Sequence, residues 1–186
     1  MSGIISDNQG RSSGLVKAAA AAAGGGLLQI KQAVKTDVVT SYSTEAYADV
    51  TGMTVDITPT LSTSKILVLF TINIGCFTSG GAGPTVRLVR DTTPICVSTD
   101  ATTIGASRVN ASFSSVWAGI AAGHVQSISH QFIDAPATTS ATTYKLQWYT
   151  ESGYSIALNY ASTTNASRLG NSASTITAIE LAVGVL

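Results

Sequence analysis

The stretch KILVLFTINIG at residues 65–75 limits the choice of fold more than any other part of the chain. Its centre, Ile66 to Phe70, is an unbroken apolar run, a pattern that indicates a strand covered on both faces. Such a strand needs neighbouring strands beside it and a packed layer on either side. The sequence around it supplies further strand patterns, and no helical pattern competes with them after Gln32.

Apolar and polar residues alternate in short segments from Gln32 onward, and turn-forming residues separate these segments. Met53, Val55 and Ile57 alternate with Thr and Asp, and a hairpin is expected around Asp91 to Pro94. About nine or ten strands spaced by about 8 to 15 residues predict an all-β fold, an antiparallel β-sandwich of the jelly-roll type. The expected strands are KTDVVTS, EAYADVTGMTVDI, KILVLFTINIG, TVRLVRD, PICVST, RVNASFSSVWAGI, HVQSISHQFI, TTYKLQWYT, YSIALNY and STITAIELAVG.

The same alternation predicts the core of the sandwich. Successive side chains on a strand point to opposite faces, so Trp148 and Tyr149 face opposite ways and at least one of them belongs to the core. The expected core residues are Ile66, Val68, Phe70, Val86, Leu88, Phe132, Leu146, Ile176 and Ile179.

The chain carries very little charge. Ten Lys and Arg side chains balance ten Asp and Glu, and the four types make up only 11% of the 186 residues. Nucleic-acid binding draws on Lys and Arg placed against phosphates, so this balance argues against DNA or RNA as a ligand, and likewise against a polybasic membrane patch. A weakly charged chain with a net charge near zero tends to self-associate, which first indicates an obligate oligomer.

The first 31 residues do not follow the strand pattern. A polar stretch precedes six alanines and the GGG at 24–26, and the apolar run 18–28 is too short to span a bilayer. A signal peptide fits this lead poorly, so assembly in a cytoplasm is expected. Residues 15–23 favour a helix but are too few to hold one unaided. We therefore expect residues 1–31 to form an extended or partly helical arm, and residues 32–186 to form a knob.

The arm has the profile of a segment that becomes ordered on a partner surface. Two small apolar pairs flank a polar linker, and the glycines beyond them allow the arm to bend. The alternative is a frayed terminus with no role. The expected docking residues are Ile4, Ile5, Arg11, Leu15, Val16 and Lys17.

Four phrases carry a resemblance to a known type of protein: SDNQGRSSGLVKAA, VTGMTVDITPTLSTSKILVLFTIN, FIDAPATTSATTYKLQW and NSASTITAIELAVG. Together they resemble a recurrent structural protein of marine tailed bacteriophages, found as tail-fibre ends and as virion surface proteins. The resemblance implies a homotrimeric jelly roll similar to TNF-like and fibre-knob domains. It also implies that the hairpin in VRLVRDTTPI brings Arg87 and Arg90 near a subunit boundary.

The two histidines are the first candidates for a site. His124 and His130 differ by an even number, so on one continuous strand they share a face. They indicate either a metal site or general base, or else polar residues at a subunit seam; the seam is favoured because no Cys, Asp or Glu stands at ligand spacing. In a trimer, a His close to the threefold axis could still hold an ion.

Glu180 interrupts the apolar final strand, where an unpaired buried charge is costly. We expect either that its face is exposed, as at a seam, or that Arg87, Arg90 or Lys65 pairs with it. The other carboxylates are scattered in or beside turns, a common position for Asp. No catalytic residue, metal or cofactor is expected, and the chain is not expected to be an enzyme.

The cysteines and aromatic residues leave alternatives open. For Cys76 and Cys96, two buried thiols are favoured over a single disulfide bridge, because free Cys is among the most buried residue types. Aromatic residues are few, so core and seam packing is favoured over glycan contact. If a glycan does bind, Trp117 and Tyr154 are the expected contacts.

These features together predict a non-enzymatic structural protein on the virion surface. A short arm and a compact trimeric knob suit a capsid decoration or cement protein better than a fibre, which needs a long shaft. The expected partners are further copies of the chain and a virion protein, either the major capsid protein or a tail component. The alternative is a short tail appendage whose knob binds a host surface glycan.

Overall fold

The structure, a computed structural model, describes residues 26–42, 45–76, 82–99, 109–116, 124–151, 153–160 and 171–182. Within these ranges the chain forms strands and turns, with no helix. The strands are β1 (Leu27–Lys35), β2 (Val39–Tyr42), β3 (Ala48–Ile57), β4 (Lys65–Cys76), β5 (Ala82–Arg90), β6 (Thr93–Ile95), β7 (Phe113–Val116), β8 (Val125–Asp134), β9 (Thr142–Tyr149), β10 (Ile156–Leu158) and β11 (Ser174–Leu181).

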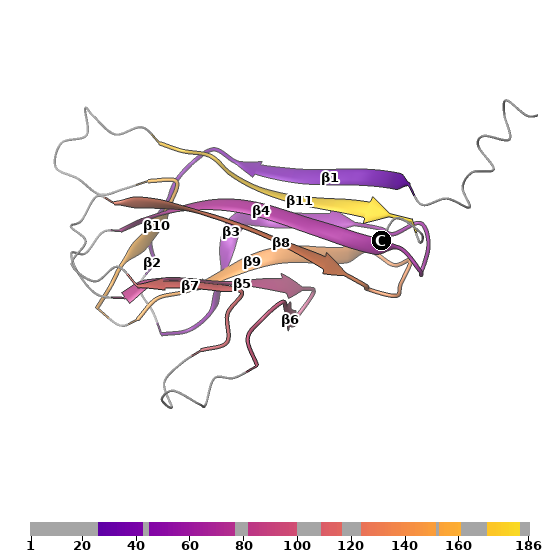
Figure 1. Cartoon of the computed structure of the whole chain (residues 1–186). Coiled ribbons are helices and arrows are strands. Elements are labelled where there is room, and N and C mark those ends of the chain that lie inside the picture. Colours follow the sequence, from indigo (N-terminus) through magenta and orange to yellow (C-terminus); the bar gives the residue numbers. More distant parts are fainter. Residues whose placement is uncertain are drawn as a thin grey trace, which may run out of the picture.

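The strands form two antiparallel sheets that pack face to face (Figure 1). In sheet A, β1, β11, β4 and β8 lie in that order, and β10 and β2 continue beside the far part of β4. In sheet B, β3, β9 and β5 lie in order, and both β6 and β7 pair with β5. The chain crosses between the sheets repeatedly, from β3 to β4 to β5 and from β7 to β8 to β9 to β11. This order confirms the expected jelly-roll sandwich.

The interior between the sheets holds apolar side chains taken from alternate positions of each strand. Trp148 is buried, and Tyr149 points to the outer side, as expected. Ile179 was wrongly expected in the core, because Ile176, Ala178 and Glu180 take the inward positions of β11. Of the other expected core residues, Phe132 packs half-buried against the core and the rest are buried: Ile66, Val68, Phe70, Val86, Leu88, Leu146 and Ile176.

β4 lies at the centre of sheet A, and the described residues cover it on one side only. Ile66, Val68 and Phe70 are buried against sheet B. Leu67 and Leu69 point to the outer side, where both are only half-buried. The apolar run predicted cover on both faces, and the described part of one chain provides it on one.

β1 is an edge strand that the sequence pattern did not predict. It pairs with β11 from Leu27 opposite Leu181 to Lys35 opposite Ser174. It also packs across β3, where Gly52 has a φ of +82° and an added Cβ would come within 2.6 Å of the Lys35 side chain. The strand begins before residue 32, the expected start of the knob. The expected helix at 15–23 lies outside the described residues.

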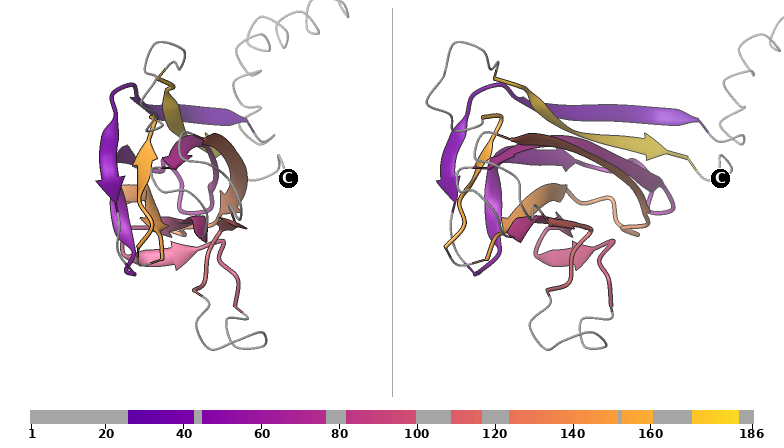
Figure 2. Two further views of the ribbon diagram at one scale, coloured as in Figure 1. Left: turned by 90° about the vertical axis from the view of Figure 1, so that its left-hand side faces the viewer. Right: turned by 60° about the vertical axis from the view of Figure 1, so that its left-hand side comes forward.

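The connection between β6 and β7 projects from sheet B. Figure 2 shows its described parts, 96–99 and 109–112, extending away from the two layers. Ser98 N–H donates to Ala111 O at 3.1 Å and Ser112 N–H donates to Val86 O at 2.9 Å, so the base of the projection is tied to itself and to β5. The tight hairpin between β5 and β6 is confirmed, with Asp91 at a φ of +54°.

Candidate interaction surfaces

The outer face of sheet B, called face B below, carries a continuous polar network. Arg87 lies 3.6 Å above the Tyr47 ring, and its Nε donates to Gln147 Oε1 at 2.8 Å. Gln147 and Lys145 in turn donate to the two carboxylate oxygens of Asp49, at 2.6 and 2.8 Å. Burial raises the pKa of Asp49, but the hydrogen bonds from Lys145 and Gln147 outweigh it and hold that pKa below its usual range.

Tyr47 closes this network at its other end. Its hydroxyl donates to Asn110 O at 2.7 Å, and its ring lies 5.6 Å from that of Tyr149. Burial raises the pKa of Tyr47 to about 12, although the nearby Arg87 acts against the rise. Arg87 is thus bound to its own chain; its expected place near a subunit boundary stays a prediction.

Arg90 also forms an ion pair within its own chain. Its Nη1 donates to both carboxylate oxygens of Asp134 at 2.8 Å, and the Tyr144 hydroxyl donates to the same carboxylate at 2.6 Å. Burial and the bond to Asp134 raise the pKa of Tyr144. These contacts tie the end of β8 in sheet A to β5 and β9 in sheet B, and the seam role of Arg90 stays a prediction.

Glu180 is fully buried beneath β1, and the expected exposure or cation pair is wrong. Its carboxylate accepts bonds from Gln29 Nε2, Thr60 N–H, Thr60 Oγ1 and Ser64 Oγ, at 2.6 to 2.8 Å. Burial alone raises the pKa of Glu180, but these bonds outweigh it and lower the pKa. Neutral donors thus take the place of the expected cation, because they satisfy the oxygens without a second buried charge. We leave Glu180 out of the proposed subunit interface.

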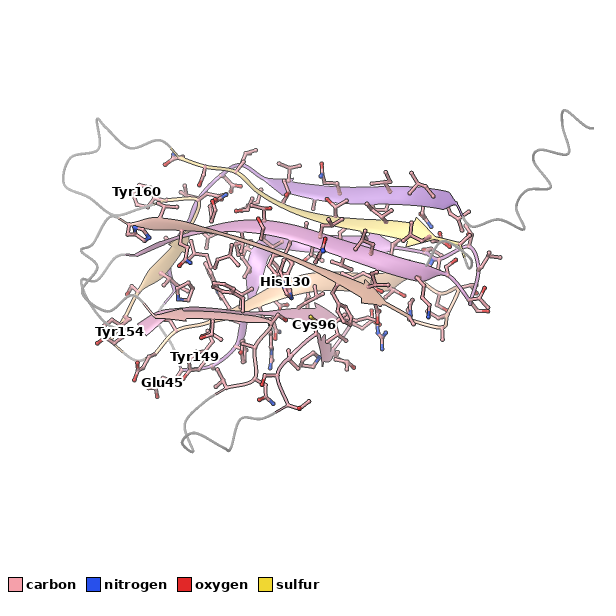
Figure 3. All side chains as sticks on the ribbon, viewed as in Figure 1. Glu45, Cys96, His130, Tyr149, Tyr154 and Tyr160 are labelled. Carbon is pink, nitrogen blue, oxygen red and sulfur yellow. The ribbon has the colours of Figure 1, made fainter. Side chains whose placement is uncertain are left out.

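His130 faces the interior of the sandwich, and His124 is exposed just before β8. The His130 ring meets that of Phe70 edge-on at 5.9 Å, and its Nε2 lies 3.4 Å from Cys96 Sγ (Figure 3). Cys96 is a free, half-buried thiol whose pKa is raised by burial, opposite to the lowered pKa of a nucleophilic cysteine. The seam role of the two histidines stays a prediction.

The expected glycan contacts are only partly described. Tyr154 is half-buried, and its backbone N–H donates to Glu151 O at 3.2 Å across the turn. Tyr149, Tyr160 and Glu45 lie toward the same end of the sandwich as Tyr154 (Figure 3). Trp117 and the docking residues Ile4, Ile5, Arg11, Leu15, Val16 and Lys17 lie outside the described residues, as does the side chain of Cys76.

The outer face of sheet A, called face A below, is very different from face B. The strand registers place twelve of its side chains in three rows of four across β1, β11, β4 and β8. The edge strand β1 contributes some of the most exposed large apolar side chains, with Leu27 57%, Ile30 53% and Val34 53% exposed. The rows are Ile30, Ile179, Leu67, Ile133; Gln32, Thr177, Leu69, Gln131; and Val34, Thr175, Thr71, Ser129.

Among the described residues, no group of three or more His, Cys, Asp and Glu side chains is placed to hold a metal ion. In the same part of the chain, no helix is long and apolar enough to cross a membrane.

Sequence reasoning missed most residues of the polar networks. Tyr47 lies just before β3, Asp49 lies near the start of β3 and Gln147 lies on β9, while the donors to Glu180 come from β1 and from the connection between β3 and β4. Only the pairing register brings them together, and a single sequence does not contain that register. One signal in the sequence could have predicted the donors to Glu180. An acid inside an apolar strand requires hydrogen-bond donors, and the segment PTLSTS, which ends just before β4, offers several hydroxyl groups.

This chain is similar to known proteins only at the level of distant solved structures. No protein-family model matches the chain, and no curated protein sequence matches it. One similar solved structure is the VP2 subviral particle of infectious bursal disease virus, at 12% sequence identity and a TM-score of 0.40. Another is the structure of the Gx strain of infectious bursal disease virus, at 14% sequence identity and a TM-score of 0.38. A third is a mutant VP2 in T=1 particles, at 12% and 0.39.

These matches cover 82%, 84% and 82% of this chain, but only 40%, 37% and 39% of the virus chains. The chain therefore spans about two fifths of their length. All three solved structures are of this virus or of its particles.

Proposed function

We propose that this chain is a non-enzymatic structural protein of a tailed-phage virion. In this proposal, three copies form a jelly-roll knob on the virion surface, and the N-terminal arm that precedes β1 attaches the knob to the particle. The favoured placement is that of a capsid decoration or cement protein bound to the major capsid protein.

One observation carries this proposal: three of the four phrases that resemble phage virion proteins pair with one another in the fold, and the fourth, SDNQGRSSGLVKAA, lies outside the described residues. VTGMTVDITPTLSTSKILVLFTIN supplies much of β3 and β4, FIDAPATTSATTYKLQW the end of β8 and most of β9, and NSASTITAIELAVG supplies β11. β4 pairs with both β8 and β11, and β3 pairs with β9. The resemblance therefore rests on one continuous body spanning both sheets and not on scattered fragments.

The position of the two described ends agrees with an attachment by the arm. Ala182 N–H donates to Gly26 O at 2.9 Å, so the first and last described segments meet at one end of the sandwich. In Figure 1 this is the end where β1 begins. An arm that precedes residue 26 starts from this end and leaves the opposite end of the knob open.

The test compares particle attachment by the full chain and by a chain lacking residues 1–26. The shortened chain should keep its β circular dichroism spectrum and its thermal transition, but should no longer cosediment with capsids. If it still attaches as well as the full chain, the arm is not the anchor. If neither chain attaches to capsids or to tails, the virion proposal fails.

A second candidate is a tail appendage that binds a host surface glycan. The observation in its favour is that Tyr149, Tyr154 and Tyr160 lie toward the end opposite the meeting point of Gly26 and Ala182 (Figure 3). Tyrosine rings provide a flat apolar surface together with a polar hydroxyl. Here the chain lacking residues 1–26 should still adhere to host cells and compete with infection, whereas a decoration protein should do neither.

A further inference from the structure

The first row of face A forms an apolar band across the four strands β1, β11, β4 and β8. Ile30, Ile179, Leu67 and Ile133 lie side by side in register. Ile30 is 53% exposed and Ile133 is 43% exposed, while the two central side chains are half-buried by their neighbours. A continuous band of this kind differs from the single exposed apolar residues that are normal on protein surfaces, and it marks a contact surface.

The other two rows of face A are uncharged and mostly polar, with Leu69 and Val34 as their apolar members. Gln32 Nε2 donates to Thr177 Oγ1 at 2.9 Å, and the Thr71 and Ser129 hydroxyl groups lie 2.8 Å apart. Since these groups already bond within the face, covering them leaves few unpaired donors and costs little. No Lys, Arg, Asp, Glu or His occurs in the three rows; Lys65, in the next row beside Leu181, marks the border.

The strand that carries the most exposed part of the band is held firmly from beneath. Gln29 on the inner side of β1 donates to the buried Glu180 at 2.6 Å and to Thr58 O at 2.7 Å. Ala33 packs against the core. β1 is thus fixed in position before any partner arrives, and a partner that covers it does not need to order it first.

We propose that face A is the surface through which copies of this chain bind one another. The inference rests on the homotrimer of the proposed function and names the face that forms it: each copy covers the apolar band of the next. It also accounts for β4, whose sequence predicts cover on both sides, whereas the described residues of one chain cover only one side.

The chemistry of the face favours a second copy over another partner. A specific interface covers about 800 Å² on each partner, so a partner must cover the polar rows as well as the band. Charged residues are depleted at the centre of such interfaces, and homo-oligomer interfaces are the more apolar ones. The three uncharged rows offer nothing to attract a charged partner, whereas the equally uncharged surface of another copy can cover them.

The test measures the mass of the full chain by light scattering at several concentrations. The variants are Ile30→Glu and Ile133→Glu, each placing a charge at a half-exposed position where the free chain can solvate it. Thr54→Glu is the matched control, because Thr54 is exposed on β3, the edge strand of sheet B, and lies opposite Lys145. Gln131→Arg, at an exposed position of face A, provides a milder variant if the others do not fold.

The wild type and Thr54→Glu should have three times the 19.0 kDa chain mass, and the face A variants should be folded monomers of 19.0 kDa. Trimeric, equally stable face A variants would overturn this inference and leave the virion trimer intact, with its interface elsewhere. A monomeric wild type would overturn the trimer as well. If removal of residues 1–25 then increased dye binding at face A, the occupant would be the chain's own arm.

Discussion

Face A and face B belong to sheets of the same fold, yet their chemistry is opposite. On face B, Arg87, Lys145 and Asp49 bond through Gln147 and Tyr47 into one charged network. On face A, three rows across four strands contain no charged side chain, and one row is entirely apolar. Both sheets bury their inner side, so the difference lies only in what each outer side meets.

The difference teaches that the low overall charge of the chain is not evenly distributed. A charged network that bonds within its own chain suits a surface that stays in water. An uncharged face with an apolar band suits a surface that another chain covers. In our proposal, face B is therefore the side that stays in water, and face A is the side that another copy covers.

The largest effect is expected inside β4, where the two sides of one strand can be compared directly. Phe70→Ala should lower the free energy of unfolding by about 3–5 kcal/mol, because it empties a buried site against His130. Leu69→Ala on the outer side should cost clearly less in the separated chain. Urea unfolding of both variants measures this, and equal losses would mean that the two sides of β4 are equally covered by one chain.

The next largest effect is expected at Glu180. Glu180→Gln should lower the free energy of unfolding by about 2–3 kcal/mol, because an amide nitrogen would face donors that now bond to a carboxylate. Asp56→Asn is the matched control on face B and should change it by less than about 0.5 kcal/mol. If both variants unfold alike, the carboxylate beneath β1 does not hold that strand.

The stability of the protein at acid pH should also depend on Glu180. The pKa of Glu180 is lower in the folded chain than its ordinary value of 4.5, so its contribution to stability is present above that value and is lost as the pH falls through the folded pKa. The wild type should therefore lose more stability than Glu180→Gln between about pH 5 and pH 3. Thermal unfolding across this range measures the difference, and parallel curves would contradict it.

A smaller effect is expected at Tyr47 on face B. Tyr47→Phe removes the bond to Asn110 O and should cost about 0.5–1.5 kcal/mol without changing the mass in solution. The pKa of Tyr47, raised to about 12, predicts that this phenol ionises late in an alkaline absorbance titration. If Tyr47→Phe lost the trimer, face B would take part in the assembly, and the distinction between a solvent-facing face B and a covered face A would be wrong.

The smallest effect is expected at the exposed ion pair of face B. Asp49→Ala removes the contacts to Lys145 and Gln147 and should cost no more than about 1 kcal/mol, since exposed pairs contribute little and salt screens them. The cost should shrink as salt is added. A large loss that is independent of salt would mean that this network is buried in the assembled protein.

The sequence predicted the sandwich and most of its core, because strand alternation is a local signal. It failed at Ile179 and at β1. In β11 the acid Glu180 takes an inward position that no periodicity would assign to a charge, and in LLQIKQAVK the outward side chains are largely apolar. Both departures lie on or under face A, where the pattern serves a second contact as well as the core. The registers that build the networks depend on pairings between distant segments, which one sequence does not encode locally.

The most direct measurement is the rate of thiol labelling at one position on each face of the full chain. Ile133→Cys and Thr54→Cys are both exposed positions in the separate chain. With the modified peptide identified by mass spectrometry, Thr54→Cys should react quickly at every concentration. Ile133→Cys should react slowly and gain speed on dilution, as copies separate. Equal rates at both positions at all concentrations would contradict the claim that face A is covered by another copy of the chain.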